Sequence, residues 1–282
     1  MRKKIFEEYP IPKAILTLAI PTVLTQLVTV LYNLADTFFV GQMGDSNKVA
    51  AVSLCLPVFY IMLATSNLFG LGAGTYISRL LGRCEIDSVK PVASVGFYSC
   101  LISGALSGIL LLVFTRSILN LIGATPETYG YARDYLTIIA IGAPVITLQN
   151  GMPQIVSAEG ATKHSMIGMM IGTVANIVLD PLMILTFGWG VTGAAIATVI
   201  GNILCVGYLM YYVLRSKDTS LSISPRHFKP TLEMYSAMLK TGFPAAVHTV
   251  LFCTGNALVN KFASIYSNNA VSAMGIAYRI EQ

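Results

Sequence analysis

Seven stretches of the chain are predominantly apolar, and each is long enough to cross a membrane as a helix. A spanning helix needs roughly 20 apolar residues, because the hydrocarbon core of a bilayer is about 30 Å thick. The stretches run approximately over residues 14–40, 49–77, 92–114, 135–156, 166–187, 191–214 and 238–265. We therefore predict an all-α, polytopic membrane protein. The first stretch is too long for a cleaved signal peptide, so we expect it to remain in the mature chain.

One part of the chain repeats another. Residues 18–33, LAIPTVLTQLVTVLYN, align without gaps with residues 241–256, TGFPAAVHTVLFCTGN. The alignment matches Pro21 to Pro244, the asparagines that end both segments also match, and an AVS triplet follows in each. We interpret this as a parallel repeat of two helical bundles, an arrangement that alternating-access transporters use.

The repeat suggests how the chain is divided. Residues 1–215 would form a six-helix lobe, residues 216–234 a cytoplasmic linker, and residues 235–282 the first helix and the start of the second helix of another lobe. The chain stops inside the helix that corresponds to the second one. We therefore expect a piece of a protein with about twelve helices.

Composition and charge agree with a membrane protein. The chain is 55% apolar and 11% charged, which does not suit a domain with an aqueous surface. Its net charge of +5 would suggest nucleic acid in a soluble protein, but position explains it better here. Basic residues gather before the first stretch and after the second, fourth and sixth. The positive-inside rule then places the N-terminus in the cytoplasm. We expect the protein in the plasma (inner) membrane, with the lipid bilayer and not nucleic acid as its partner.

No pattern of an enzyme is found. The five cysteines have no CxxC spacing, and there is no Walker loop, nucleophile elbow or HExxH motif. We expect neither a catalytic residue nor a cofactor.

Two acidic residues lie well inside apolar stretches, Asp36 in the first and Asp180 in the fifth. An aspartate at the centre of a bilayer costs about 2.5 to 3.5 kcal/mol on insertion scales, so two of them on separate helices suggest a shared purpose. We expect both side chains to face the interior of the bundle.

Other polar residues are spaced to join them. Gly172, Asn176 and Asp180 follow each other at intervals of four and lie along one helix face, and Asn33 stands three residues before Asp36. Pro181 deprives the carbonyl of Ile177 of its helical partner. Thr198 and Asn202 present a similar pair at i, i+4 in the sixth stretch. Together these residues predict an oxygen-rich pocket with two acids and no nearby base, which suits a proton or a hard cation.

Ordinary structural roles compete with this interpretation for single residues. Asn33, Asn176 and Asn202 each fit interhelical hydrogen bonding equally well, and Thr198 alone fits a threonine that bonds back to its own helix. The two aspartates are harder to explain in that way.

The chain resembles the multidrug and toxic compound extrusion (MATE) transporters. The resemblance rests on four motifs that follow each other in the family's order: LYNLADTFFVGQMG, IGATPETYGYARDYLTI, SAEGATKHSMIGMMIGTVANIVLDPLMI and GVTGAAIATVIG. It implies twelve helices in two six-helix lobes.

The resemblance also implies roles for particular residues. The proton or sodium site of the family falls on four residues: Asp36, Asn176, Asp180 and Thr198. We assign Asn33, Tyr135 and Asn202 to the substrate cavity, Tyr135 because it matches a cavity tyrosine of the family, and Pro21 matches the bending proline of the first helix. Ser157 stands where the family often has an arginine, and residues 249–259 lack the acid that one branch carries in its seventh helix.

From these features we predict a monomeric secondary active antiporter, not an enzyme, that exports amphipathic, often cationic, organic compounds against a proton or sodium gradient. A flippase for lipid-linked substrates is the related alternative, and it should need basic cavity residues, for which Lys261 is the one candidate. A channel or a non-transporting scaffold is the unrelated alternative, and it would have no use for two buried acids.

Overall fold

The structure is a computed structural model that describes residues 10–42, 45–216 and 219–266, and every regular element in this part of the chain is helical. The elements are α1 (Ile11–Gly41), α2 (Ser46–Leu54), α3 (Leu56–Ser66), the π-helical turn η2 (Asn67–Leu71), α4 (Gly72–Gly82), α5 (Ile86–Val113), α6 (Thr115–Leu121), α7 (Pro126–Ala158), α8 (Thr162–Pro181), the π-helical turn η3 (Leu182–Thr186), α9 (Gly190–Arg215), the short 3₁₀ helix η4 (Pro225–His227) and α10 (Leu232–Tyr266). The prediction of an all-α chain is confirmed.

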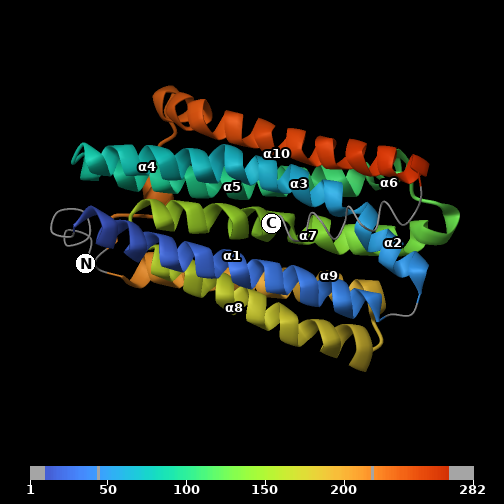
Figure 1. Ribbon diagram of the computed structural model, residues 1–282. Helices are drawn as coiled ribbons and strands as arrows, with labels where there is room; N and C mark the ends of the chain where they lie inside the picture. Colours follow the sequence, from blue (N-terminus) through green and yellow to red (C-terminus); the bar gives the residue numbers. More distant parts are fainter. Residues whose placement is uncertain (1–9, 43–44, 217–218, 267–282) are drawn as a thin grey trace.

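The long helices lie side by side around α7, with α1, α8 and α9 on one side of it and α3, α4, α5 and α10 on the other (Figure 1). Glycines allow the central helix to approach its neighbours closely. A Cβ atom at Gly104 of α5 would lie 2.8 Å from the Cα atom of Pro144 in α7, and one at Gly108 would collide with the carbonyl of Ala140. Small residues at such crossings are the usual means of packing helices in a membrane.

The second apolar stretch is not one uniform helix. It is divided into α2, α3, η2 and α4, with Pro57 in the first turn of α3. A proline at this position cannot donate a backbone hydrogen bond to the preceding turn, which favours a break there. The π-helical turn follows at the point where Gly70 meets α7: a Cβ atom at Gly70 would lie 2.5 Å from the Cα atom of Gly151. The short helix α6 was not expected from the sequence.

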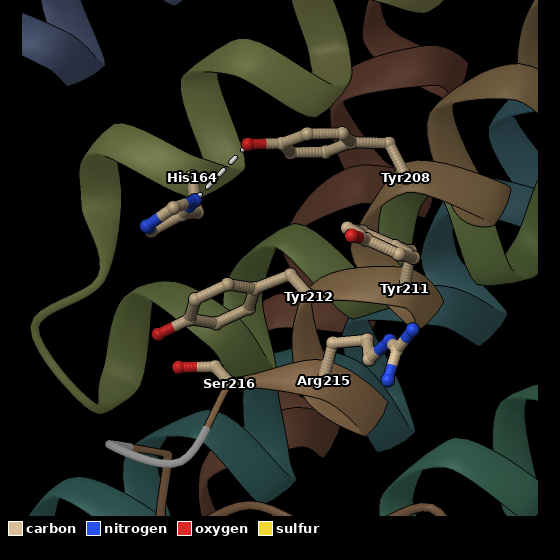
Figure 2. Close-up of a pocket in the computed structure, with 6 residues that line it drawn as sticks. All are labelled: His164, Tyr208, Tyr211, Tyr212, Arg215 and Ser216. Atoms are coloured by element: carbon tan, nitrogen blue, oxygen red, sulfur yellow. Dashed lines mark hydrogen bonds between the residues drawn. The ribbon is translucent and has the colours of Figure 1, made fainter.

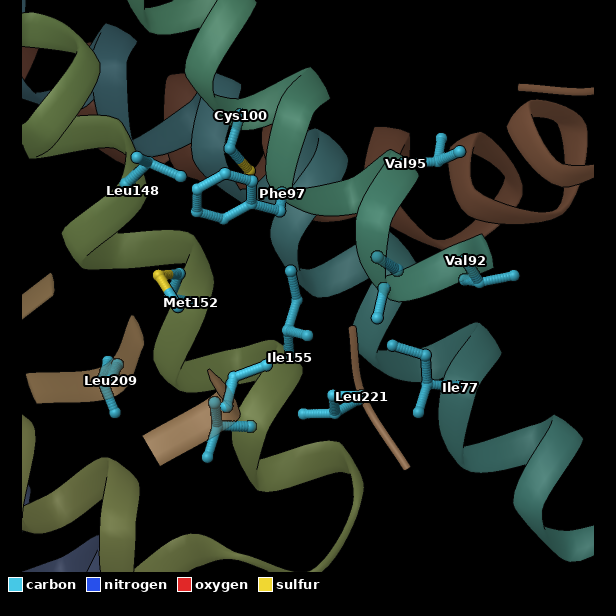
Figure 3. Packing of buried hydrophobic residues seen from close by; sticks show 14 of the residues in the cluster. Ile77, Val92, Val95, Phe97, Cys100, Leu148, Met152, Ile155, Leu209 and Leu221 are labelled. Carbon is cyan, nitrogen blue, oxygen red and sulfur yellow. The ribbon is translucent and has the colours of Figure 1, made fainter. Parts of the chain in front are cut away.

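Apolar side chains of α4, α5, α7 and α9 form one of the two buried clusters in the described part of the chain, and Leu221 from the segment that follows α9 joins them (Figure 3). Ile77, Phe97 and Leu209 are among the members that are fully or almost fully buried. The segment between α9 and α10 is therefore anchored to the bundle by an apolar residue.

Six helical segments in the described residues are long and apolar enough to cross a membrane. They start in α1, α2, α5, α7, α8 and α9. On α5, Ile102, Leu106 and Ile109 leave more than half of their surface exposed, as expected for side chains that face lipid. The chain is thus a multi-pass membrane protein. α10 is not among the six, so the seventh span and the division into two lobes stay predictions.

α10 nevertheless packs closely on α3, η2 and α4. A Cβ atom at Gly72 would lie 2.5 Å from the carbonyl oxygen of Met238, and one at Gly242 would collide with the carbonyl of Leu68. The first half of α10 is thereby fixed against the bundle.

Candidate functional site

One face of α8 is buried along its whole length, at Ser165, Gly168, Gly172, Asn176 and Asp180. The intervals of three and four residues are those of a single helix face. This confirms that Gly172, Asn176 and Asp180 lie on one face, as the sequence predicted.

Two glycines bring this face against α9. A Cβ atom at Gly172 would lie 2.8 Å from the carbonyl oxygen of Gly201, and a Cβ atom at Gly201 would lie 2.8 Å from the carbonyl oxygen of Gly172. The two backbones therefore touch at this crossing. Asn176 lies directly beside it, because its Cβ atom would be 3.3 Å from a Cβ atom at Gly201.

Asn176 and Asp180 are shielded from solvent, with 3% and 0% of their surfaces exposed. Among the described residues, neither the oxygen nor the nitrogen of the Asn176 amide has a hydrogen-bond partner. An unsatisfied polar group in a protein interior costs about 1 to 3 kcal/mol, so such a group calls for a ligand or another partner. The carboxylate of Asp180, one helical turn away, does take part in an interaction.

The helix changes its winding immediately after Asp180. Pro181 has no backbone N–H, and the π-helical turn η3 begins at the next residue. π-helical turns often occur at functional sites, because the extra residue shifts the side chains and frees backbone groups. η3 also lies against α9, where a Cβ atom at Gly193 would be 2.8 Å from the carbonyl oxygen of Met183.

α1 packs against both α8 and α9, which brings the helix that carries Asn33 and Asp36 to the same part of the bundle (Figure 1). The side chains of Asn33 and Asp36 lie outside the described part of the structure. Their contribution to the site stays a prediction.

The other expected members of the site differ in their surroundings. The hydroxyl of Thr198 donates to the carbonyl of Ala194 at 3.0 Å, which is the back-bonding role that competes with ion binding, although its oxygen keeps lone pairs for a ligand. Asn202 is half-buried on α9 beside Gly201. Tyr135 is buried in an apolar cluster, with its ring 6.3 Å from that of Phe59. Pro21 lies inside an uninterrupted α1.

The sequence interpretation missed a buried carboxylate at the end of α7. Glu159 is only 1% exposed and accepts hydrogen bonds from the hydroxyl of Tyr212 at 2.9 Å, from the hydroxyl of Thr219 at 3.0 Å, and from the N–H of Ser220 at 3.2 Å. Its position between Ala158 and Gly160, where the helix ends, suggested an exposed loop. Its partners lie 53 to 61 positions later in the chain. A single sequence gives no sign that residues so far apart are in contact.

A second polar chain was also missed. The amide nitrogen of Gln154 in α7 donates to Asn67 in η2 at 3.0 Å, and the amide nitrogen of Asn67 donates to the hydroxyl of Thr249 in α10 at 3.1 Å. This chain links three helices within the apolar bundle, and it places polar groups between α10 and the rest of the structure.

Comparisons with known proteins agree on one family. The family model described as MatE matches residues 21–182, more than half of the chain. The multidrug export protein MepA of Staphylococcus saprophyticus is 35% identical over 277 residues, which are 98% of this chain and 61% of that protein.

Two solved structures of MATE proteins are similar throughout the chain. One, in a straight conformation, has a TM-score of 0.91 and 30% identity over 99% of this chain and 62% of its own. The other, in a bent conformation, has a TM-score of 0.85 and 31% identity over 95% of this chain and 60% of its own. This chain therefore spans about three-fifths of the length of these relatives.

Proposed function

This chain belongs to the multidrug and toxic compound extrusion (MATE) family, and from that premise we propose that the full-length protein is a secondary active antiporter of the plasma membrane. It exports amphipathic, often cationic, organic compounds in exchange for protons or sodium ions, and its N-terminus lies in the cytoplasm. The name of the MepA relatives, multidrug export proteins, supports the export of drugs in general.

The buried polar face of α8 is the observation that carries this proposal. An aspartate and an asparagine lie one turn apart on this face, and both are shielded from solvent. Burying them in a membrane helix costs free energy, so we infer that they have a function. The amide oxygen of Asn176 lacks a partner among the described residues and is a suitable ligand for a hard cation. A proton on a carboxylate of the pair Asp36 and Asp180 would be the alternative coupling ion.

The helix contacts suggest how ion binding would act on the protein. α1 packs on α8 and α9, so the state of the site affects how α1 is held. An ion can shift this packing only by binding one arrangement of the helices more tightly than another. In that way Asp36, Asn176, Asp180 and Thr198 would couple the ion to the conformation, while Asn33, Tyr135 and Asn202 would contact the exported compound.

The test is transport by the full-length protein in sealed lipid vesicles. The vesicles contain a fluorescent organic cation, and either a proton gradient or a sodium gradient is imposed across the membrane in separate experiments. We expect the dye to be transported against its own concentration gradient when at least one of the two ion gradients is imposed. Flux that only follows the dye gradient would indicate a channel, and movement of labelled lipid instead of dye would indicate a flippase.

A further inference from the structure

A pocket of about 260 Å³ lies where the first turn of α8 meets the last turns of α9. Six residues line it: His164, Tyr208, Tyr211, Tyr212, Arg215 and Ser216 (Figure 2). His164 precedes Asn176 by twelve residues, which corresponds to about 18 Å along a helix. The pocket is therefore separate from the candidate coupling site.

Hydrogen bonds and a ring stack hold the aromatic side chains of this pocket in place. His164 Nδ1 shares a hydrogen bond of 3.0 Å with the hydroxyl of Tyr208, and the imidazole stacks on the ring of Tyr212 with 4.0 Å between centroids (Figure 2). The hydroxyl of Tyr212 donates in turn to the buried carboxylate of Glu159. Tyrosines are common at membrane surfaces as simple anchors, but anchoring alone does not require this bracing.

The lining favours an anion. None of the six lining residues is acidic, and Arg215, the last residue of α9, brings a guanidinium to the pocket. A guanidinium offers paired N–H donors that match the oxygens of a phosphate. Lys163, which is exposed beside His164 in the sequence, adds positive charge nearby.

An exposed apolar strip runs from this pocket along α9. Leu204, Gly207, Tyr211 and Leu214 follow each other at intervals of three and four residues and lie on one exposed face. A Cβ atom at Gly207 would meet nothing within 4 Å, so the strip has a gap beside Tyr211. A ligand that enters the pocket with its charged group finds an apolar surface for a long tail.

We propose that this pocket binds the phosphate of an anionic phospholipid, with an acyl chain along the strip formed by Leu204, Gly207, Tyr211 and Leu214. Arg215 donates to the phosphate, while the His164–Tyr212 stack shapes the pocket. Basic pockets between membrane helices bind anionic lipid head groups for the same electrostatic reason.

The proposal is tested by lipid binding to the purified full-length protein, measured by native mass spectrometry. Dioleoyl phosphatidylglycerol and dioleoyl phosphatidylcholine are titrated in parallel, and inorganic phosphate is added as a competitor. We expect the wild type to prefer the anionic lipid and Arg215→Gln to reduce its affinity for that lipid about fivefold, because the change removes the one guanidinium among the six lining residues. The matched control is Arg83→Gln, which removes an exposed arginine at the end of α4 and should leave the preference unchanged.

A second variant guards against misfolding of the first. His164→Phe keeps an aromatic ring on Tyr212 but removes the bond to Tyr208, and it should also weaken binding of the anionic lipid. Equal binding of both lipids by the wild type, or equal losses in Arg215→Gln and Arg83→Gln, would overturn the proposal. Displacement of the lipid by an equal concentration of inorganic phosphate would also overturn it, because the site would then be one for free anions.

Discussion

At the scale of single residues, Asn176 and Asp180 on the buried face of α8 have different chemistry. A carboxylate can change its charge, whereas the amide of Asn176 can only offer an oxygen or its hydrogens. Of the proposed site residues, Asp180 and Asp36 are therefore the ones that can exchange a proton, whereas Asn176 would act as a fixed ligand.

We expect Asp36→Asn and Asp180→Asn each to abolish coupled efflux by the full-length protein, because both changes keep the size of the side chain and remove its charge. The measurement is gradient-driven dye efflux from vesicles at matched protein content. Asp87→Asn, which changes an exposed acid in the first turn of α5, is the control and should transport normally. Wild-type efflux by either of the first two variants would contradict the assignment.

Replacement of Asn176 distinguishes an ion ligand from a helix-packing residue. Asn176→Leu removes an amide that has no partner among the described residues, so unfolding without added ion should occur at the same temperature or a higher one. The rise in melting temperature on adding sodium, or on acidification, should be lost. If the variant is destabilised and still responds to the ion, the amide of Asn176 stabilises helix packing and does not bind the ion.

Glu159 should matter for stability through the segment that joins α9 to α10. Its carboxylate accepts from Tyr212, Thr219 and Ser220, and hydrogen bonds to charged groups contribute about 1.5 to 3 kcal/mol each. We expect Glu159→Ala to lower the melting temperature of the full-length protein clearly and Glu159→Gln to lower it less. The exposed Glu85 serves as the control, and an equal effect of Glu85→Ala would contradict this role.

At the scale of helices, the apolar pattern was sufficient to predict every long helix, because length and hydrophobicity are properties of the local sequence. The common face of Gly172, Asn176 and Asp180 was also predictable from helical periodicity. The π-helical turns η2 and η3 were not, since a proline such as Pro181 does not by itself specify a π-helical turn, and the contact of Gly70 with Gly151 joins residues far apart in the sequence. The partners of Glu159 and Asn67 were missed for a similar reason: they lie far away in the sequence.

Pro21 lies fifteen residues before Asp36 on α1, about four turns away. Its ring cannot donate to the carbonyl of Thr17, whereas its own carbonyl accepts from the hydroxyl of Thr25 at 2.8 Å. Bending therefore costs less at this position than elsewhere on the helix.

If Pro21 is a working hinge, Pro21→Ala should slow the turnover of dye efflux and leave the affinity for the coupling ion nearly unchanged. Both are measured on the full-length protein, turnover in vesicles and affinity by the ion-dependent melting temperature. A static kink that only improves packing predicts normal turnover. Complete loss of ion binding would place Pro21 in the site itself, and either result would contradict the hinge.

At the scale of the whole molecule, the contact of α10 with η2 and α4 is where we predict that a second lobe is attached. Gly72 and Gly242 bring the backbones together, and the hydrogen bond between Asn67 and Thr249 adds a polar link. The contact joins the six-helix lobe to the first helix of the predicted repeat. In a transporter with two rocking lobes, such a contact lies at the interface where the lobes move against each other.

Residues 1–282 alone should therefore insert into vesicles and bind the coupling ion but not transport. The residues of the candidate ion site all lie on α1, α8 and α9, whereas alternating access requires two bundles around a central site. The chain spans only about three-fifths of the length of its MATE relatives. The measurement compares dye flux and the ion-dependent melting temperature of the fragment with those of the full-length protein in the same lipids. Gradient-driven flux by the fragment would contradict the two-lobe mechanism, and loss of the ion response in a folded fragment would show that the ion site needs residues of the second lobe.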